Sequence, residues 1–375
     1  MTTKPGVIII GGGLAGLASA IHLSKKGLGV TVIEKSGYPR HKVCGEYISN
    51  EILPYLEWLG VDVSILNPTR INRFEFSTMN GKSVVAQLPL GGFGISRYTL
   101  DNFLHHEAIA NGCTFIEEAV TYIHCQDDIF TVKTKNETYT AAIVIGAYGK
   151  RSNIDALLSR NFIKHRSPWL AVKAHYTGTF PNNVVALHNF SGGYCGISKV
   201  EGEKINICYL ADYKTFKQYK NIEDYQKQVL YKNRHLKDIF EGSTLLFDKP
   251  LTISQICFDK KAPVENHILM VGDTAGLIHP LCGNGMAMAI HSAKIASELV
   301  ADYYSGKISS RKILEKEYTR QWNAQFSKRL FMGRVLAKVL KNKTVAAQLL
   351  KIAVSFPAIL PAIIKQTHGN PIAVN

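Results

Sequence analysis

Several structural signatures are absent from this sequence of 375 residues. Its seven cysteines are odd in number and include no Cys-x-x-Cys pair, so we expect neither a disulfide framework nor a zinc or other metal site. No run of eighteen apolar residues occurs, so we expect no helix that spans a bilayer. An apolar stretch near the N-terminus is interrupted by three glycines and lacks a basic leader, so we expect no targeting segment. Unpaired thiols are typical of the reducing cytosol.

Charged residues are also scarce, and they are unevenly distributed. They make up 19% of the chain while 46% of it is apolar, which excludes a disordered chain and a coiled coil. The formal net charge is +15, and residues 306–375 alone carry thirteen Lys or Arg and two Glu, a net charge of +11. Such a tail predicts an anionic partner. The tail contains no nucleic-acid reader motif, so we expect no nucleic acid, and an anionic membrane surface stays open as a partner.

Hydrophobic patterns divide the chain into two kinds of unit. Largely apolar runs at 7–10, 30–33, 141–146 and 268–271 are typical of parallel strands buried on both faces. Alternating patterns at 70–96 and 169–258 instead indicate antiparallel strands. We predict an α/β fold: a Rossmann-like dinucleotide domain, an inserted antiparallel β substrate domain and C-terminal helices. The predicted boundaries are 1–69, 97–168 and 259–305 for the discontinuous dinucleotide domain, 70–96 and 169–258 for the substrate domain, and 306–375 for the basic helical region.

Helix signals complete this picture. Ser96 is placed to cap a helix from Arg97 to about Ala110, because its hydroxyl can accept a bond from a free backbone N–H. In the basic tail, prolines at positions 357 and 361 are expected to break the helices. The other helices that we predict lie at 14–26, 50–59, 224–231 and 286–304.

A glycine-rich turn joins the first predicted strand to the first predicted helix. It reads Gly11-x-Gly13-x-x-Gly16, and Glu34 closes the next strand eighteen residues later. In this context the pattern is the dinucleotide fingerprint: Gly13 admits the pyrophosphate to the backbone, and Gly16 lets the helix pack closely on the sheet. Glu34 is placed to bind ribose hydroxyls. The residues that we expect to contact the dinucleotide here are Gly11, Gly13, Leu14, Ala15, Gly16, Glu34 and Lys35.

A second glycine-rich turn follows the strand predicted at 268–271. Asp273, just beyond the strand end, can accept hydrogen bonds from a sugar-alcohol chain. Gly283 and Gly285 let the backbone approach a flat ring, and the N-terminus of the following helix would stabilise negative charge on that ring. A reduced flavin carries such charge, so the turn indicates FAD. The residues predicted to bind the cofactor here are Gly272, Asp273, Pro280, Gly283, Gly285 and Met286.

Together these turns resemble the para-hydroxybenzoate-hydroxylase type of FAD-dependent oxidoreductase. The run at 39–45, Pro-Arg-His-Lys-Val-Cys-Gly, is similar to the Pro-x-x-Lys-x-Cys-Gly signature of the geranylgeranyl reductase branch. The resemblance implies an extended FAD, with Lys42 beside it and Arg97 at its pyrophosphate. It also implies that Cys44 lies beside the flavin ring and lines the substrate cavity, which Glu46 and His279 flank. All three are predicted catalytic residues, with Glu46 and His279 as candidate proton donors.

Two stretches depart from the family pattern. Tyr148 stands where relatives carry the Asp of a Gly-Ala-Asp-Gly turn, and that Asp is linked to FAD and NADPH handling. NAD(P)H and an external electron donor therefore both stay open. The stretch Tyr194-Cys195-Gly196-Ile197-Ser198-Lys199 lacks the aromatic residues of the prenyl reductase motif Tyr-x-Trp-x-Phe-Pro-Lys, which leaves the substrate open. The Trp-x-Trp-x-Ile-Pro motif of flavin halogenases is absent, which argues against halogenation.

The leading interpretation is an FAD-dependent oxidoreductase acting on a hydrophobic small molecule. In this interpretation it reduces carbon–carbon double bonds of an isoprenoid, polyene or polyketide-like substrate. One alternative is an FAD-dependent monooxygenase that hydroxylates an aromatic ring. A second alternative is a non-catalytic flavin-binding protein associated with a membrane.

The basic tail permits two interpretations. Arg334, Lys338 and Lys341 share one helical face and Val335 lies away from it, while residues 346–354 and 356–364 are largely apolar. This pattern is typical of an amphipathic helix on an anionic membrane. It is equally typical of a helical lid that packs on the core. We therefore predict a cytoplasmic protein, with peripheral attachment to the inner face of the membrane left open.

Overall fold

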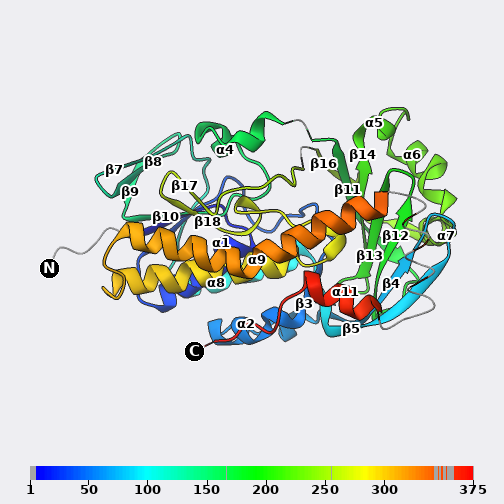
Figure 1. The fold of residues 1–375 in the computed structure, drawn as a ribbon, viewed down its shortest axis with the longest axis horizontal. Helices are drawn as coiled ribbons and strands as arrows, with labels where there is room; N and C mark the ends of the chain where they lie inside the picture. Colours follow the sequence, from blue (N-terminus) through cyan, green and yellow to red (C-terminus); the bar gives the residue numbers. More distant parts are fainter. Residues whose placement is uncertain are drawn as a thin grey trace.

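A computed structural model of the chain describes residues 6–165, 167–254, 256–341, 345, 348, 352 and 359–374. Two large sheets occupy opposite ends of an elongated molecule, and long helices run along one side of it (Figure 1). Thus the α/β fold and the C-terminal helices predicted from the sequence are confirmed.

The first sheet contains the four largely apolar strands predicted from the sequence. Its order is β17-β18-β10-β1-β2-β6, and all neighbours are parallel except β17 and β18. Every residue of β1 and β10 is buried, as expected for strands covered on both faces. The strands are β1 (Val7–Ile10), β2 (Val30–Ile33), β6 (Thr114–Ile116), β10 (Ile143–Gly146), β17 (Val264–Glu265) and β18 (Ile268–Met270).

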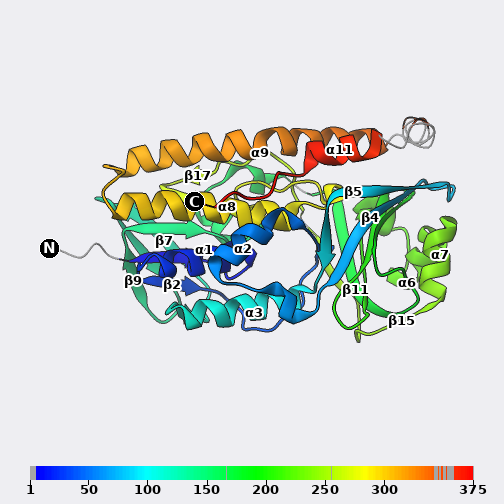
Figure 2. The ribbon, with the colours of Figure 1, turned by 90° about the horizontal axis from the view of Figure 1, so that it is seen from below.

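Helix α1 (Leu14–Lys25) packs against β1 and β2, and α3 (Arg97–Ala110) and α8 (Gly285–Tyr304) pack against α1. The hydroxyl of Ser96 accepts a hydrogen bond from the backbone N–H of Thr99, which confirms the predicted cap of α3. Helix α9 (Arg311–Lys341) lies along the outside of α8 (Figure 2). A three-stranded sheet also contacts the first sheet and comprises β7 (Tyr122–Gln126), β8 (Ile129–Lys133) and β9 (Thr138–Ala141).

The second sheet has nine strands in the order β15-β11-β14-β13-β12-β4-β5-β3, with β16 also paired to β11. We predicted an antiparallel sheet, and β12 with β4 is the exception, because this pair is parallel. The two strands come from separate segments of the chain, so no hairpin forces them to run in opposite directions. The strands are β3 (Tyr47–Ser49), β4 (Thr69–Ser77), β5 (Ser83–Gly94), β11 (Trp169–Gly178), β12 (Val184–Phe190), β13 (Gly193–Lys199), β14 (Ile205–Asp212), β15 (Ser243–Leu245) and β16 (Leu251–Ser254).

Short helices complete the two halves, and three of them were not predicted: α4 (Asn153–Leu157), α5 (Tyr213–Phe216) and α7 (Arg234–Glu241). We predicted a single helix within 169–258; it overlaps α6 (Ile222–Gln228), and α7 follows α6 after a short 3-10 turn. The side chain of Asn233 caps α7, a signal present in the sequence. Strand β3 pairs with β5 although it lies within residues 1–69; the domain boundaries stay a prediction. The remaining helices are α2 (Leu53–Leu59) and α11 (Ile359–Thr367).

The C-terminal segment returns to the body of the molecule. Helix α11 packs against α9 and β5, and the last described residues lie beside α2 (Figure 1). Pro361 does not break α11, because it lies in the first turn, where a backbone N–H has no partner within the helix. Pro357, the Lys341 side chain and most of the apolar run at 346–358 lie outside the described residues. No helix in the described ranges is both long and apolar enough to cross a membrane.

Candidate active site

One cavity of about 920 Å3 extends between the two large sheets. Both glycine-rich turns line it, although they are about 260 residues apart in the sequence. The predicted cofactor-binding residues that line it are Gly11, Gly13, Leu14, Ala15, Glu34, Lys35, Lys42, Arg97, Gly272, Asp273, Pro280, Gly283, Gly285 and Met286. The structure therefore brings together the residues predicted to bind one extended ligand.

The first turn leaves open space in front of Gly13. A Cβ atom built on Gly13 would lie 3.6 Å from a guanidinium nitrogen of Arg97 and 4.0 Å from Nζ of Lys42. Gly16 does not line the cavity, since its Cβ would lie 2.0 Å from the carbonyl oxygen of Gly11. These contacts fit the predicted roles, with Gly13 facing a ligand and Gly16 allowing the helix to pack closely. Glu34 accepts a hydrogen bond of 2.8 Å from the backbone N–H of Gly12.

Two cations lie over this turn. Arg97 and Lys42 both donate to the buried carboxylate of Asp101, with N···O distances of 2.6 Å for Arg97 Nε and 2.6 Å for Lys42. Burial by itself would raise the pKa of Asp101, but the charges of Arg97 and Lys42 outweigh it and hold this pKa below its usual value. Two cations and one anion leave a net positive charge beside Gly13, which fits a diphosphate group.

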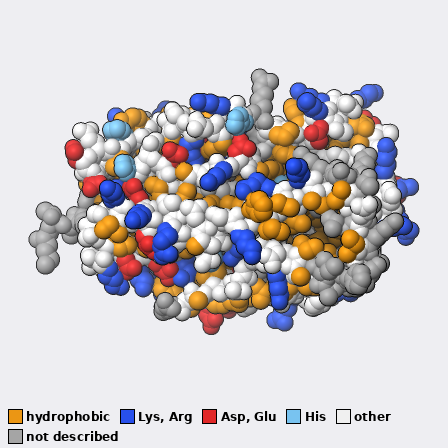
Figure 3. All heavy atoms as spheres, in the orientation of Figure 1, with side chains coloured by type: hydrophobic (Ala, Val, Ile, Leu, Met, Phe, Trp, Pro, Cys, Tyr) orange, Lys and Arg blue, Asp and Glu red, His pale blue; other side chains and the backbone are white. Residues whose placement is uncertain are grey.

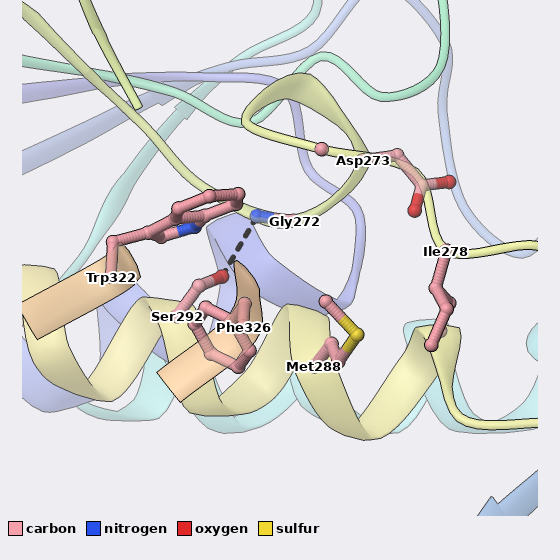
Figure 4. A pocket seen from close by; sticks show the side chains of 9 residues that line it. Gly272, Asp273, Ile278, Met288, Ser292, Trp322 and Phe326 are labelled. Carbon is pink, nitrogen blue, oxygen red and sulfur yellow. Dashed lines mark hydrogen bonds between the residues drawn. The ribbon is translucent and has the colours of Figure 1, made fainter. Parts of the chain in front are cut away.

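The second turn is held by α8. The backbone N–H of Gly272 donates to the hydroxyl of Ser292 over 2.8 Å, and the carboxylate of Asp273 points away from this bond and from Trp322 (Figure 4). Asp273 also lines the large cavity. Gly283 has φ +63°, a conformation that favours glycine, and α8 begins two residues later. The N-terminus of α8 therefore lies at the cavity.

Cys44 lies where the loop between β2 and β3 meets α8. Its sulfur is 3.5 Å from the sulfur of Met286, and both residues line the cavity. The side-chain amide of Asn206, on β14, donates to the carbonyl oxygens of Cys44 and Gly45 over 3.2 and 2.8 Å. The second sheet thus positions the cysteine loop. No local pattern in the sequence indicated a role for Asn206.

Glu46 is wholly buried, and its carboxylate is surrounded by donors. His175 lies 2.6 Å away, Lys173 lies 3.2 Å away, and the backbone N–H of Arg97 donates over 2.9 Å. Burial would raise the pKa of Glu46, but the hydrogen bond with His175 and the charge of Lys173 lower it below its usual value. An ionised carboxylate with its oxygens occupied has no proton to give. This environment argues against the proton-donor role predicted for Glu46.

His279 lies beside the cavity lining, between Ile278 and Pro280, which both line the cavity. Its ring is buried among aromatic rings, with centroids 4.5 Å from Phe258, 5.6 Å from Tyr194 and 6.3 Å from Trp169. It is not among the described residues that line the large cavity. The position favours packing beside the cavity wall over proton transfer to a substrate.

Tyr148, the departure from the family turn, lines the cavity as well. Its hydroxyl lies 3.5 Å from the sulfur of Met270. Burial, followed by the charge of Asp155, raises the pKa of Tyr148 well above its usual value. The side chain is therefore a neutral phenol, where the family pattern has a carboxylate.

The far end of the cavity is formed mainly by apolar side chains of the second sheet. These include Phe74, Phe76, Leu88, Val185, Leu187, Ile197, Leu210 and Ile253. The C-terminal segment closes one wall with Leu336, Ile352, Leu360, Ile363, Ile364, Thr367 and His368. The sequence left open whether the C-terminal tail forms a lid. In the structure, α11 forms part of the cavity wall. Periodicity alone could not reveal this contact, since it identifies an apolar face without its partner.

The sequence of residues 4–326 matches the FAD-binding domain family. The chain belongs to this family. This flavoprotein is an FAD-dependent oxidoreductase, and the predicted family and cofactor are confirmed. The open space at Gly13, the cations beside it and the N-terminus of α8 fit the diphosphate and the ring of FAD.

Relatives and solved structures resemble this flavoprotein over most of its length. Digeranylgeranylglycerophospholipid reductase of Methanococcus vannielii is 24% identical over 379 residues, covering 94% of this chain and 90% of the relative. A geranylgeranyl bacteriochlorophyll reductase-like structure from Thermoplasma acidophilum has a TM-score of 0.76 and 19% identity, covering 97% of this chain and 96% of that one. A flavin-dependent brominase has a TM-score of 0.79 and 18% identity, covering 97% and 93%. The fold is thus shared by proteins with different reactions.

Proposed function

We propose that this flavoprotein reduces carbon–carbon double bonds of an isoprenoid or a similar polyene. The observation that carries the proposal is the continuity of the cavity: one end is lined by the two glycine-rich turns and the other by aliphatic and aromatic side chains. A long apolar chain suits that second end, because its burial removes apolar surface from water. The M. vannielii relative, which acts on a geranylgeranyl lipid according to its name, supports the same substrate class.

The residues of the chain have three tasks in this proposal. Lys42 and Arg97 would hold the diphosphate, and the N-terminus of α8 would stabilise negative charge on the ring. The apolar wall excludes water and orients the substrate. Bound FAD, once reduced, supplies the hydride, and a proton completes the saturated bond.

Cys44 is the residue that we propose to orient the reacting double bond and pass on the proton. Its thiol lies 3.5 Å from Met286 at the start of α8, both residues line the cavity, and Asn206 of the second sheet holds the same loop. Glu46 and His279 are less suited, for the reasons given above. Cys125, which is half-buried like Cys44, lies on β7 outside the cavity lining and provides a matched control.

The test is a reaction without oxygen. The purified holoprotein is reduced with dithionite, mixed with a geranylgeranyl lipid, and the product is analysed by mass spectrometry. We expect two hydrogens added per reduced bond, with at least a tenfold slower rate for Cys44→Ala and an unchanged rate for Cys125→Ala. A product that forms only in air would indicate the monooxygenase. Bound FAD that is reduced but transforms no polyene would indicate a flavin-binding protein without this activity.

The identity of Tyr148 is the basis on which we propose the class of electron donor. A neutral phenol replaces the carboxylate linked to nicotinamide handling in the resembling family, so we propose an external one-electron donor of the ferredoxin type. Bleaching of the flavin absorbance under anaerobic conditions compares NADH, NADPH and reduced ferredoxin. We expect rapid bleaching by ferredoxin alone. Equally fast bleaching by either nicotinamide would contradict this proposal without affecting the reductase reaction.

A further inference from the structure

The outward face of the C-terminal half of α9 combines cations with exposed apolar side chains. We call it the α9 stripe, and it consists of Lys328, Phe331, Arg334, Val335 and Lys338. At 100° per residue these side chains lie within one third of the helix circumference. Phe331 is 57% exposed and Val335 is 37% exposed. The sequence pattern placed Val335 away from the cations, whereas in the structure it is exposed to solvent with them.

The three cations of the α9 stripe have no acidic partner within the described part of the chain. The sequence explains this, because residues 318–375 contain no Asp or Glu at all. Their charge is therefore not neutralised locally, unlike that of Arg320, which pairs with Glu317 one turn earlier on α9. Such a surface attracts anions.

The α9 stripe borders an entrance to the large cavity. Leu336, next to Val335 in α9, lines the cavity, and so do Ile352, an exposed side chain, and Leu360 of α11. Figure 3 shows hydrophobic side chains gathered around a hollow over the C-terminal half of α9, with Lys and Arg around them. The same region thus offers exposed apolar atoms, free positive charge and access to the apolar end of the cavity.

We propose that the α9 stripe docks on an anionic lipid bilayer, and that an apolar substrate enters the cavity from this membrane. Lys328, Arg334 and Lys338 would contact the lipid phosphates, while Phe331 and Val335 would enter the interfacial layer. This inference goes beyond the proposed reaction, which requires only the cavity.

Vesicle co-sedimentation of the holoprotein tests the proposal without substrate or reductant, so its failure is distinct from a failure of the reductase reaction. We expect binding to phosphatidylglycerol vesicles, little binding to pure phosphatidylcholine vesicles, and release at high salt. Lys328→Gln, Arg334→Gln and Lys338→Gln together should weaken binding about a hundredfold, because each cation near an anionic surface contributes about fivefold. Phe331→Ser with Val335→Ser should weaken it at least tenfold.

Matched controls change the same number of exposed residues elsewhere. Lys135→Gln, Lys312→Gln and Lys316→Gln remove three exposed cations, and Ile65→Ser with Ile109→Ser removes two exposed apolar side chains. Both controls should bind vesicles like the unmodified protein, and flavin absorbance verifies that every variant is folded. The proposal is overturned if the unmodified protein does not bind anionic vesicles, or if the control variants lose as much binding as the α9 stripe variants. It is also overturned if the stripe instead mediates self-association that the triple variant abolishes.

Discussion

Gly13 and Gly16 lie three residues apart in the first turn, yet a methyl group at each would meet different neighbours. At Gly13 the nearest atoms belong to the flexible ends of Arg97 and Lys42, 3.6 and 4.0 Å away. At Gly16 the nearest atom is the rigid carbonyl oxygen of Gly11, 2.0 Å away. The first substitution therefore intrudes on ligand space, and the second intrudes on the protein itself.

This difference predicts separate effects of two alanine substitutions. Gly13→Ala should leave the melting temperature of the apoprotein nearly unchanged but weaken FAD binding at least tenfold, about 1.4 kcal/mol. Gly16→Ala should cost about 1–3 kcal/mol of apoprotein stability, because the helix must move away from the turn. Absorbance titration with FAD and thermal unfolding of the apoprotein measure the two effects. Equal FAD affinity for Gly13→Ala and the unmodified protein would show that the diphosphate does not approach Gly13.

Glu46 and Lys173 form a buried ion pair. Glu46→Gln would leave the buried ammonium of Lys173 without a counter-charge, and we expect a loss of about 3–5 kcal/mol at pH 7. The pKa of Glu46 is lower in the folded protein than in the unfolded chain. The ionised carboxylate therefore adds to the free energy of unfolding above pH 4.5, and this stabilisation is lost as the pH falls through the pKa of the folded state. Urea unfolding at pH 7 and at pH 4 measures both.

The double variant Glu46→Gln with Lys173→Met provides the control for this pair. Removing both charges should recover part of the stability that Glu46→Gln loses, since no uncompensated buried charge remains. If the double variant is as unstable as the sum of the single variants, the two side chains do not interact energetically.

At the scale of elements, one carboxylate fastens the C-terminal segment to the rest of the chain. Glu51, wholly buried before α2, accepts bonds from Asn284 at the start of α8 (3.2 Å) and from Arg329 of α9 (3.3 Å). It also accepts a bond of 2.6 Å from the backbone N–H of Gly369, just beyond α11. The wall of the cavity formed by α11 is thereby tied to α8, whose N-terminus also lies at the cavity.

We expect Glu51→Gln to loosen α11 without unfolding the sheets. An amide offers one acceptor oxygen and weaker bonds to Arg329, so the segment after α9 should open more often. Trypsin cleavage after the exposed Lys365, followed by mass spectrometry, should accelerate at least fivefold. Glu57→Gln, an exposed change on α2, should leave the cleavage rate unchanged. Equal cleavage rates for the two variants would show that Glu51 does not hold the segment.

At the scale of the whole molecule, histidines with lowered pKa values make stability depend on pH. Burial lowers the pKa of His22 and His188 to about 3 and that of His291 to about 4. Below pH 6.5 these three side chains therefore bind protons in the unfolded chain that they do not bind in the folded protein. The free energy of unfolding should fall by about 4 kcal/mol per pH unit near pH 5, since each proton contributes about 1.4 kcal/mol.

Urea unfolding measured between pH 7 and pH 4.5 checks this slope. His188→Asn should reduce the slope by about 1.4 kcal/mol per pH unit, whereas a change of the exposed His124 to Asn should leave it as it is. A slope that His188→Asn does not alter would mean that His188 is protonated in the folded protein.

The sequence by itself determined the two glycine-rich turns, the apolar strands around them and FAD as the cofactor. These features depend on neighbours within one turn or strand, where spacing and residue type decide the conformation, as Gly13 and Ser96 illustrate. Only the tertiary structure decided the surroundings of the Glu46 carboxylate, because its partners Lys173 and His175 lie more than 120 residues away. It also brought Asn206 to the Cys44 loop and α11 to the cavity wall. Such contacts join segments that are distant in sequence, and no local period records them.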